Sequence, residues 1–446
     1  MSKEIKWGCI QPLTGGMYIG ALKAIGHQAE WILSYDGLDA ITVAGDKDNP
    51  IITGAGNEYN LREWLFKSTK DGYKVPYYQI TNRKMFDMDI HSTDLKVRKG
   101  LEDDVPLPDF SDMDLVVAVP VCSGLSVVTK AANETKESRN CNMQWITYYT
   151  LNVIKPKVYV FENAPTLVGD RGDDVRASLE DIAKNAGYSV LYYKTDTVLH
   201  HNCQRRPRTF VIFTQWQGKN TEQKPPLFGY EKDSILIPEF FESISKDAPQ
   251  QTPVESFIHN YAAIDYNVKN YGENWADEIK DKRNIITYIM KTGKLEDFLK
   301  FVKESDKYTD EEKAKVEKYF KHIFEKTSQG LNYYGEDAWV FKDYFPSVQF
   351  RSIPNMIHYT GKRFCTIREY LSLMGMPEDF IIYGDKTNLA KIGQNVPVNT
   401  AKFIVSQVVN ILNNWEYNNR EHTSNVAFQD NTKQEVLNIA TKQSLF

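Results

Sequence analysis

The chain has 446 residues, 41% of them hydrophobic and 25% charged, which predicts two to four folding units or one large domain with an insertion. A net charge of −5 argues against a protein that coats nucleic acid through bulk charge, although a local basic cleft stays possible. The absence of a long apolar run argues against a membrane span or secretory signal, and five scattered cysteines predict a reducing, cytoplasmic setting without a metal site.

The first half of the chain alternates short apolar runs with helical patterns. Strands are predicted over residues 6–13, 30–35, 114–119, 157–161, 188–193 and 209–213, and helices over 17–25 and 173–186. Strands that are apolar at consecutive positions and separated by helices are typical of a parallel sheet covered on both faces. The predicted fold class is therefore α/β.

The second half changes character after about residue 214, where proline-rich pieces and evenly charged helical segments begin. A capping box at 309–312 starts a helix that runs to about residue 326, and further helices are predicted over 366–374 and 401–412. We expect four parts, which are residues 1–213, an inserted domain at 214–349, a return segment at 350–422, and a polar tail at 423–446.

A glycine turn follows the first predicted strand. Thr14-Gly15-Gly16 leads into a helix whose free N–H groups can face a ligand. Asp36 comes 20 residues after Gly16, the spacing of an acid that binds ribose hydroxyls. These features predict half of a nucleotide-binding unit, although an ordinary turn with a surface acid gives the same pattern.

Reactive side chains lie at the ends of three later strands. Cys122 follows strand 114–119, and its thiolate is a candidate nucleophile. Glu162 follows strand 157–161, where it can protonate or hydrogen-bond a ligand. Three arginines within 205–208 precede strand 209–213 and suit an anionic substrate. Each feature alone also fits a structural role, but their common position at strand ends favours one shared site.

With two later motifs, this ordered series resembles the cytosine-C5 DNA methyltransferase family. The later motifs are RFCTIRE followed by MPEDF, at 363–369 and 376–380, and IGQNVP at 392–397. The resemblance covers about 1–213 and 350–412, in the order of the family. This chain departs from the family pattern at the degenerate glycine turn and at Val121, Ala164 and Gln394.

The resemblance implies a Rossmann-like methyltransferase sheet that uses S-adenosyl-L-methionine. Residues 1–213 and 350–422 would form the catalytic domain, and 214–349 would be an inserted target-recognition domain. The implied partner is double-stranded DNA, from which the target cytosine is flipped out. A monomer in the cytoplasm of a bacterium or a phage-infected bacterium, solitary or part of a restriction-modification system, is the expected setting.

The resemblance also implies residue roles. Cys122 would add to C6 of the flipped cytosine, and Glu162 would donate a hydrogen bond or a proton at N3. Arg208 would hold O2, and Arg206 is the fourth implied catalytic residue. The implied substrate-binding residues are Ser123, Gly124, Asn163 and Gln204. The implied cofactor-binding residues are Thr14, Gly15, Gly16, Met17, Asp36, Asp89, Pro120, Asn395 and Val396.

Three other functions are compatible with parts of this pattern. An RNA (tRNA) cytosine-C5 methyltransferase could use the same scaffold, although the long insert favours duplex DNA. A non-catalytic DNA-binding homologue would be expected to lose Cys122 or Glu162, and both are present. A dinucleotide-dependent oxidoreductase would be expected to carry a complete GxGxxG, which this chain lacks.

Overall fold

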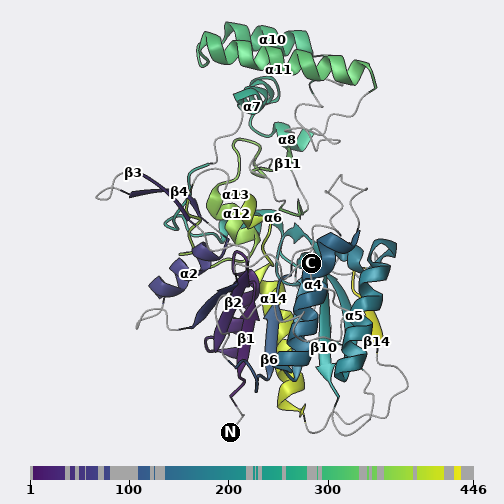
Figure 1. Cartoon of the computed structure of the whole chain (residues 1–446). Helices are drawn as coiled ribbons and strands as arrows, with labels where there is room; N and C mark the ends of the chain where they lie inside the picture. Colours follow the sequence, from purple (N-terminus) through teal and green to yellow (C-terminus); the bar gives the residue numbers. More distant parts are fainter. Residues whose placement is uncertain are drawn as a thin grey trace.

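The centre of the protein is an eight-stranded mixed sheet, whose strands run up and down the page in Figure 1. In spatial order its strands are β5 (Tyr77–Ile80), β2 (Trp31–Tyr35), β1 (Trp7–Ile10), β6 (Leu115–Ala118), β7 (Val158–Asn163), β10 (Pro207–Gln215), β8 (Tyr188–Asp196) and β14 (Val426–Asp430). The computed structural model describes residues 4–35, 41–45, 50–55, 57–68, 75–80, 109–120, 125, 136–216, 225–226, 228–229, 234–253, 258–278, 289, 294–330, 339–340, 344–348, 356–384, 389–415 and 426–432.

The strands bury side chains on both faces, as their continuous apolar runs predict. In β7, Val158 and Val160 enter one core, whereas Tyr159 and Phe161 enter the other. Successive side chains of a strand point to opposite faces, so a strand buried on both sides must be apolar throughout. The α/β fold class is confirmed.

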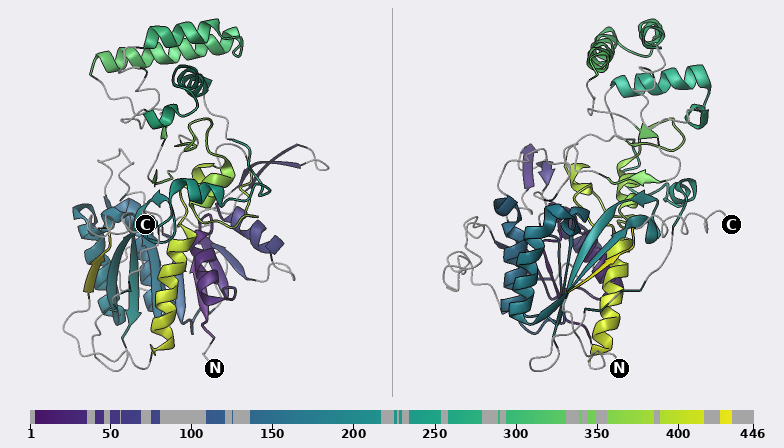
Figure 2. Two further views of the ribbon diagram at one scale, coloured as in Figure 1. Left: turned by 180° about the vertical axis from the view of Figure 1, so that it is seen from behind. Right: turned by 90° about the vertical axis from the view of Figure 1, so that its right-hand side faces the viewer.

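Helices cover the two faces of the sheet (Figure 2). The helices α1 (Gly16–Ile25) and α14 (Val398–Asn413) contribute to one core, and α4 (Lys136–Tyr149) and α5 (Asp173–Ala186) to the other. Gly20 brings α1 close to α14, because a Cβ there would lie 2.4 Å from the Cβ of Ala401. The return segment is thereby packed directly against the first helix of the chain.

The strand directions correct one prediction. β10 is antiparallel to both of its neighbours, β7 and β8, whereas the other strand pairs of the sheet are parallel. The sheet is therefore mixed and not wholly parallel, because an apolar run is equally buried in either direction and carries no signal for its orientation.

Most element boundaries agree with the sequence pattern, but the tail contains an additional strand. The helix after the capping box at Thr309 is α11 (Asp310–Ser328), and both hydrogen bonds of that box are present. Within the predicted polar tail, β14 pairs in parallel with β8, and Phe428 stacks on Tyr192 with ring centroids 4.9 Å apart. Backbone pairing, this ring stacking and the packing of Val426 and Ala427 against the two cores together attach the strand to the sheet edge.

Most of the described residues between β10 and the return segment are helical, and α7, α8, α10 and α11 share a core that also includes Ile357 and Phe364 of the return segment. Figure 1 shows α7, α10 and α11 above the sheet. Phe298 of α10 lies against Phe320 of α11, with ring centroids 4.3 Å apart. The elements here are α6 (Ile237–Glu242), α7 (Ile258–Tyr271), α8 (Trp275–Glu278), α10 (Leu295–Glu304), α11 and the short strands β11 (Trp339–Val340) and β12 (Phe345–Pro346).

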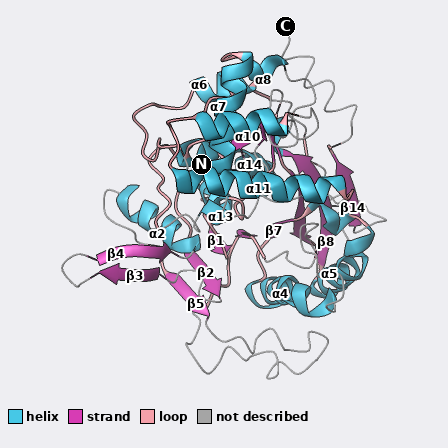
Figure 3. Cartoon of the chain, turned by 90° about the horizontal axis from the view of Figure 1, so that it is seen from above, coloured by secondary structure: helices cyan, strands magenta, loops and turns pink. Residues whose placement is uncertain are grey.

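A hairpin of β3 (Ile41–Gly45) and β4 (Pro50–Ala55) separates β2 from α2 (Asn57–Ser68). Seen from above in Figure 3, it projects to the side of the sheet near β5. The remaining elements are β9 (Gln204–Arg205), β13 (Met356–Ile357), α12 (Ile367–Leu373), α13 (Leu389–Ile392), a π-helical turn (Thr150–Ile154) and 3₁₀ turns (Pro165–Val168, Asp170–Gly172 and Thr197–Leu199).

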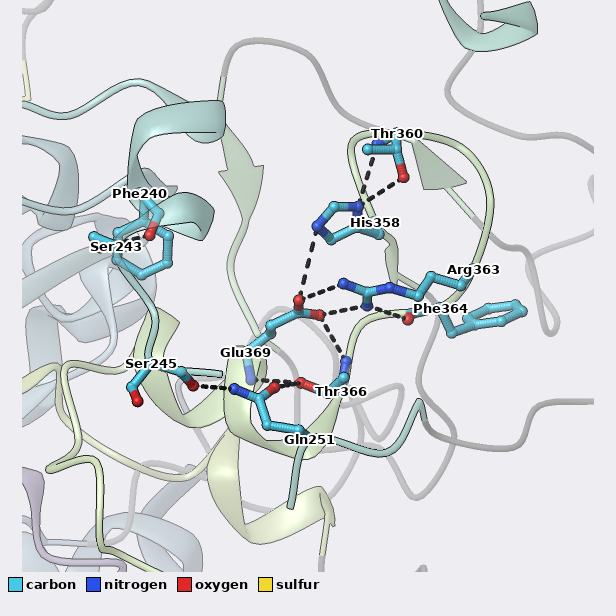
Figure 4. A network of polar contacts seen from close by, with 10 residues as sticks. All are labelled: Phe240, Ser243, Ser245, Gln251, His358, Thr360, Arg363, Phe364, Thr366 and Glu369. Atoms are coloured by element: carbon cyan, nitrogen blue, oxygen red, sulfur yellow. Dashed lines mark hydrogen bonds and ion pairs between the residues drawn. The ribbon is translucent and has the colours of Figure 1, made fainter. Parts of the chain in front are cut away.

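A buried polar network fixes the start of α12 (Figure 4). Glu369 forms a capping box with Thr366 and accepts two hydrogen bonds from the guanidinium of Arg363, at 2.9 and 2.7 Å. The Nε2 of His358 lies 3.7 Å from the same carboxylate. Burial and the charge of Arg363 nevertheless outweigh this carboxylate and lower the pKa of His358 to about 4.

The low pKa of His358 predicts acid-sensitive stability. The unfolded chain binds a proton near pH 6.5 and the folded one only near pH 4, so the free energy of unfolding should fall as the pH drops through that window. We expect a contribution of about 2 kcal/mol after allowance for solvent screening. Urea melts between pH 7 and 4 should show it, and H358Q should reduce that slope. An unchanged slope would contradict this role.

Candidate active site

One edge of the sheet collects the predicted site residues. The strand order changes direction between β1 and β6, and ligands of α/β proteins bind at the carboxyl ends of strands at such a point. The carboxyl ends of β1, β6 and β7 share this edge with the amino end of β10, because β10 is antiparallel. In a wholly parallel sheet the arginines before β10 would lie at the opposite edge.

Glu162 and Arg208 meet at this edge. Glu162 lies near the end of β7 and Arg208 at the start of β10, and the Nε of Arg208 lies 2.7 Å from the Oε1 of Glu162. Both side chains are largely buried, with 9% and 20% of their surfaces exposed. The prediction that the two act in one place therefore has the required geometry.

Burial controls the protonation of Glu162. Loss of hydration raises the pKa of its carboxyl, and this effect exceeds the opposing influence of Arg208 and Arg206. The carboxyl therefore keeps its proton to a higher pH than an ordinary glutamate. A buried acid of this kind can donate a hydrogen bond to a ring nitrogen.

Arg206 connects several segments of the chain at this edge of the sheet. Its guanidinium donates to the Oγ of Ser347 (2.8 Å) and to the carbonyl oxygens of Val348 (2.6 Å), Gly393 (2.7 Å) and Asn395 (3.0 Å). These acceptors come from the end of the inserted region and from the turn before α14. Arg206 thus joins three segments behind the Glu162–Arg208 pair, which supports a positioning role.

Gln204 has a similar supporting position. Its amide nitrogen donates to the carbonyl of Leu373 at 2.8 Å, and its amide oxygen accepts from the N–H of Val348 at 2.9 Å. The side chain is fully buried. It holds the loop before β10 against α12.

The glycine turn is closed by the return segment. Gly15 adopts a φ of 110°, and the N–H of Gly16 donates to the Oδ1 of Asn395 at 2.7 Å. A Cβ on Gly16 would lie 1.7 Å from the carbonyl oxygen of Val396, so only glycine fits. Thr14 adds a 2.7 Å hydrogen bond from its hydroxyl to the carbonyl of Lys391. The structure brings these predicted cofactor residues together.

Other predicted residues have mixed placements. Met17 and Pro120 are buried at the same edge, and the amide of Asn163 accepts from the N–H of Ala164 at 2.9 Å. Five predicted residues lie outside the described residues: Asp36, Asp89, Cys122, Ser123 and Gly124.

Two supporting residues were not predicted from the sequence. Asp196, at the end of β8, accepts the backbone N–H of Arg206 at 2.9 Å. Asn57, at the start of α2, donates to the amide oxygen of Gln394 at 2.5 Å. An Asp before a short helical turn is a recognisable capping signal, whereas the Asn57 contact has no local signature.

A comparison with protein families identifies the chain. The family model for C-5 cytosine-specific DNA methylases matches residues 54–410, which is most of the sequence. The chain belongs to this family. The resemblance inferred from the motifs is confirmed, and the protein is a member of a methyltransferase family.

Several solved structures of methyltransferases are similar to this chain, at low sequence identity. A prophage-encoded E. coli protein with the proposed role of DNA modification methyltransferase has 15% identity and a TM-score of 0.48, covering 92% of this chain and 99% of that one. The methyltransferase EhMeth of Entamoeba histolytica has 11% identity and a TM-score of 0.46, covering 93% of this chain and 99% of that one. The Dnmt2 methyltransferase of S. pombe has 12% identity and a TM-score of 0.43, covering 92% of this chain and 100% of that one. No curated protein matches the chain. None of the described helices is long and apolar enough to cross a bilayer.

Proposed function

We propose that the protein methylates C5 of cytosine in double-stranded DNA with S-adenosyl-L-methionine as the methyl donor. The observation that carries this proposal is the Glu162–Arg208 pair, in which burial raises the pKa of the carboxyl. A carboxyl that keeps its proton to a higher pH than usual, next to a guanidinium, matches the N3 and O2 atoms of cytosine. Family membership supplies the reaction class.

The turn after β1 fits the proposed cofactor. Ligands of α/β proteins bind at a switch point such as the one between β1 and β6, and Gly16 packs closely against the backbone of Val396 beside it. When bound, S-adenosylmethionine supplies an electrophilic methyl group. Its expected contacts are Gly16, Met17, Pro120, Asn395 and Val396, with Asp36 and Asp89 proposed for the ribose and adenine.

The side chains of the protein would activate the base. The thiolate of Cys122 would form a bond to C6 while Glu162 donates a hydrogen bond at N3, which places electron density on C5. Arg208 would hold O2 and keep the ring aligned. After C5 has been methylated, loss of its proton and cleavage of the C6–sulfur bond restore the aromatic ring and the thiolate. The cytosine must be flipped out of the duplex to reach these groups.

The inserted region would recognise the DNA. We assign target recognition to residues 214–349, because the matched family segment includes them and they carry most of a third, helical core. The protein would act as a monomer in the cytoplasm of a bacterium or a phage-infected bacterium. A restriction partner would make it one half of a restriction-modification system.

Trapping the covalent adduct tests this function. Duplexes of mixed sequence that contain 5-fluorocytosine should form an adduct that survives denaturation, because fluorine cannot leave C5 as the proton does. C122S should abolish the adduct. The matched control is C203A, since Cys203 is buried and burial raises the pKa of its thiol. An adduct that persists in C122S would refute the assigned nucleophile.

The same assay distinguishes the substrate classes. We expect methyl transfer from radiolabelled S-adenosylmethionine to duplex DNA and not to a tRNA transcript. Transfer to tRNA alone would replace the proposal with an RNA methyltransferase. If the protein methylates neither substrate but binds DNA, it is a non-catalytic homologue.

A further inference from the structure

Arg205 is exposed between two buried neighbours. Gln204 and Arg206 point into the protein, and the alternation of side chains along β9 sends Arg205 outward. β9 pairs in parallel with β12, where Pro346 lies opposite Arg205. The N–H of Phe345 also donates to the carbonyl of Cys203 at 2.7 Å. The backbone at Arg205 is therefore held by β12 while its guanidinium faces outward.

The guanidinium of Arg205 lies over the ring of Tyr344, with its central carbon 5.7 Å from the ring centroid. Such a contact orients a guanidinium without using its N–H donors. Among the described residues, no carboxylate forms an ion pair with Arg205 and no acceptor takes a hydrogen bond from it. The side chain of Asp196 is near enough to be influenced by its charge, but that carboxylate is buried and accepts the N–H of Arg206.

The position of Arg205 relates it to the catalytic pair. It precedes Arg208 by three residues, so their Cα atoms are at most roughly 10 Å apart. Arg208 bonds to Glu162 at the edge where the target cytosine would enter. A strand that delivers its base to this edge must carry its phosphates across the same rim.

We propose that Arg205, oriented by Tyr344, binds a phosphate of the nucleic-acid strand next to the target cytosine. This inference rests on the proposed function and adds a substrate-positioning residue to it. The planar fork of a guanidinium suits two phosphate oxygens, and phosphate contacts fix the register of a protein on nucleic acid. Because the whole chain has a net charge of −5, its affinity for a polyanion must depend on such locally placed cations.

The salt dependence of binding tests the inference. Fluorescence anisotropy with a labelled duplex would be measured for the full chain at several salt concentrations. R205A should reduce the slope of log affinity against log salt by about 0.9, which is about eightfold in affinity at 0.1 M salt. R205K should retain most of the slope, and Y344L should give an intermediate affinity because the guanidinium is no longer oriented.

A matched control removes one positive charge elsewhere. Lys184 is exposed near the end of α5, just before β8 begins at the opposite edge of the sheet. K184A should bind the duplex as the wild type does, and R205A should keep the melting temperature of the wild type, which a merely structural arginine would not.

The outcomes separate the two proposals. If the wild type binds the duplex and R205A keeps its salt slope, the phosphate contact is refuted and the proposed function stands. Equal loss of slope in R205A and K184A would also refute it, as a general charge effect. If the wild type does not bind the duplex, both proposals fail.

Discussion

The variant E162Q should lose methyl transfer by a factor of roughly 10²–10⁴, the contribution expected of a positioned acid, without losing stability at pH 8. Glutamine has the shape of the protonated carboxyl but cannot transfer a proton. Because burial raises the pKa of Glu162, its charged form is disfavoured in the folded protein relative to the unfolded chain. The neutral amide removes that penalty.

The sign of the pH effect provides a second measurement. For a carboxyl whose pKa is raised by folding, the stabilising contribution is present below its unfolded pKa and is lost as the pH rises through the folded one. The wild type should therefore lose stability relative to E162Q between pH 4.5 and pH 8. Urea melts at both pH values would show the difference, and the rate constant from single-turnover assays would show the loss of rate.

A matched substitution controls for burial alone. Glu180 of α5 is partly buried, and burial raises the pKa of its carboxyl as well, but it lies beside Tyr192 on a covering helix. E180Q should keep the rate of the wild type. If E162Q and E180Q have equal rates, Glu162 is not the acid of the reaction.

The sequence predicts the elements better than their directions. Continuous apolar runs identify β7 and β10, and the capping box at Thr309 identifies the start of α11. Nothing in the run of β10 shows that it is antiparallel, because burial on both faces does not depend on direction. That orientation places Arg208 beside Glu162, so these two predicted residues meet although the predicted sheet topology was partly wrong.

The candidate site residues are easier to predict from the sequence than the contacts that support them. Glu162, Arg208 and Gly16 are candidates from the sequence alone, because an acid, an arginine and a glycine at strand ends have few alternative explanations in combination. The supporting contacts are less accessible, since Gly16 and Asn395 are 379 residues apart and Arg206 binds mainly backbone carbonyl groups. Every residue has a carbonyl, so sequence alone cannot say which ones an arginine will reach.

The variant R206M should destabilise the protein by about 3–5 kcal/mol, because each buried acceptor left without a donor costs about 1–3 kcal/mol. Methionine preserves the volume and removes the donors, which leaves the hydroxyl of Ser347 and three carbonyl oxygens without this partner. R206K should recover only part of the stability, because an ammonium cannot span acceptors on both sides of the planar group. Urea unfolding monitored by tryptophan fluorescence would measure the loss.

Cofactor affinity should fall together with stability. Arg206 holds the carbonyl of Asn395, and the side chain of the same residue accepts the N–H of Gly16, so one residue connects the arginine to the glycine turn. Titration calorimetry with S-adenosylmethionine should show at least a tenfold weaker Kd for R206M, about 1.4 kcal/mol. The control R171M removes an exposed arginine from a 3₁₀ turn and should preserve both stability and Kd. A destabilised R206M that binds the cofactor normally would show that the turn before α14 closes without Arg206.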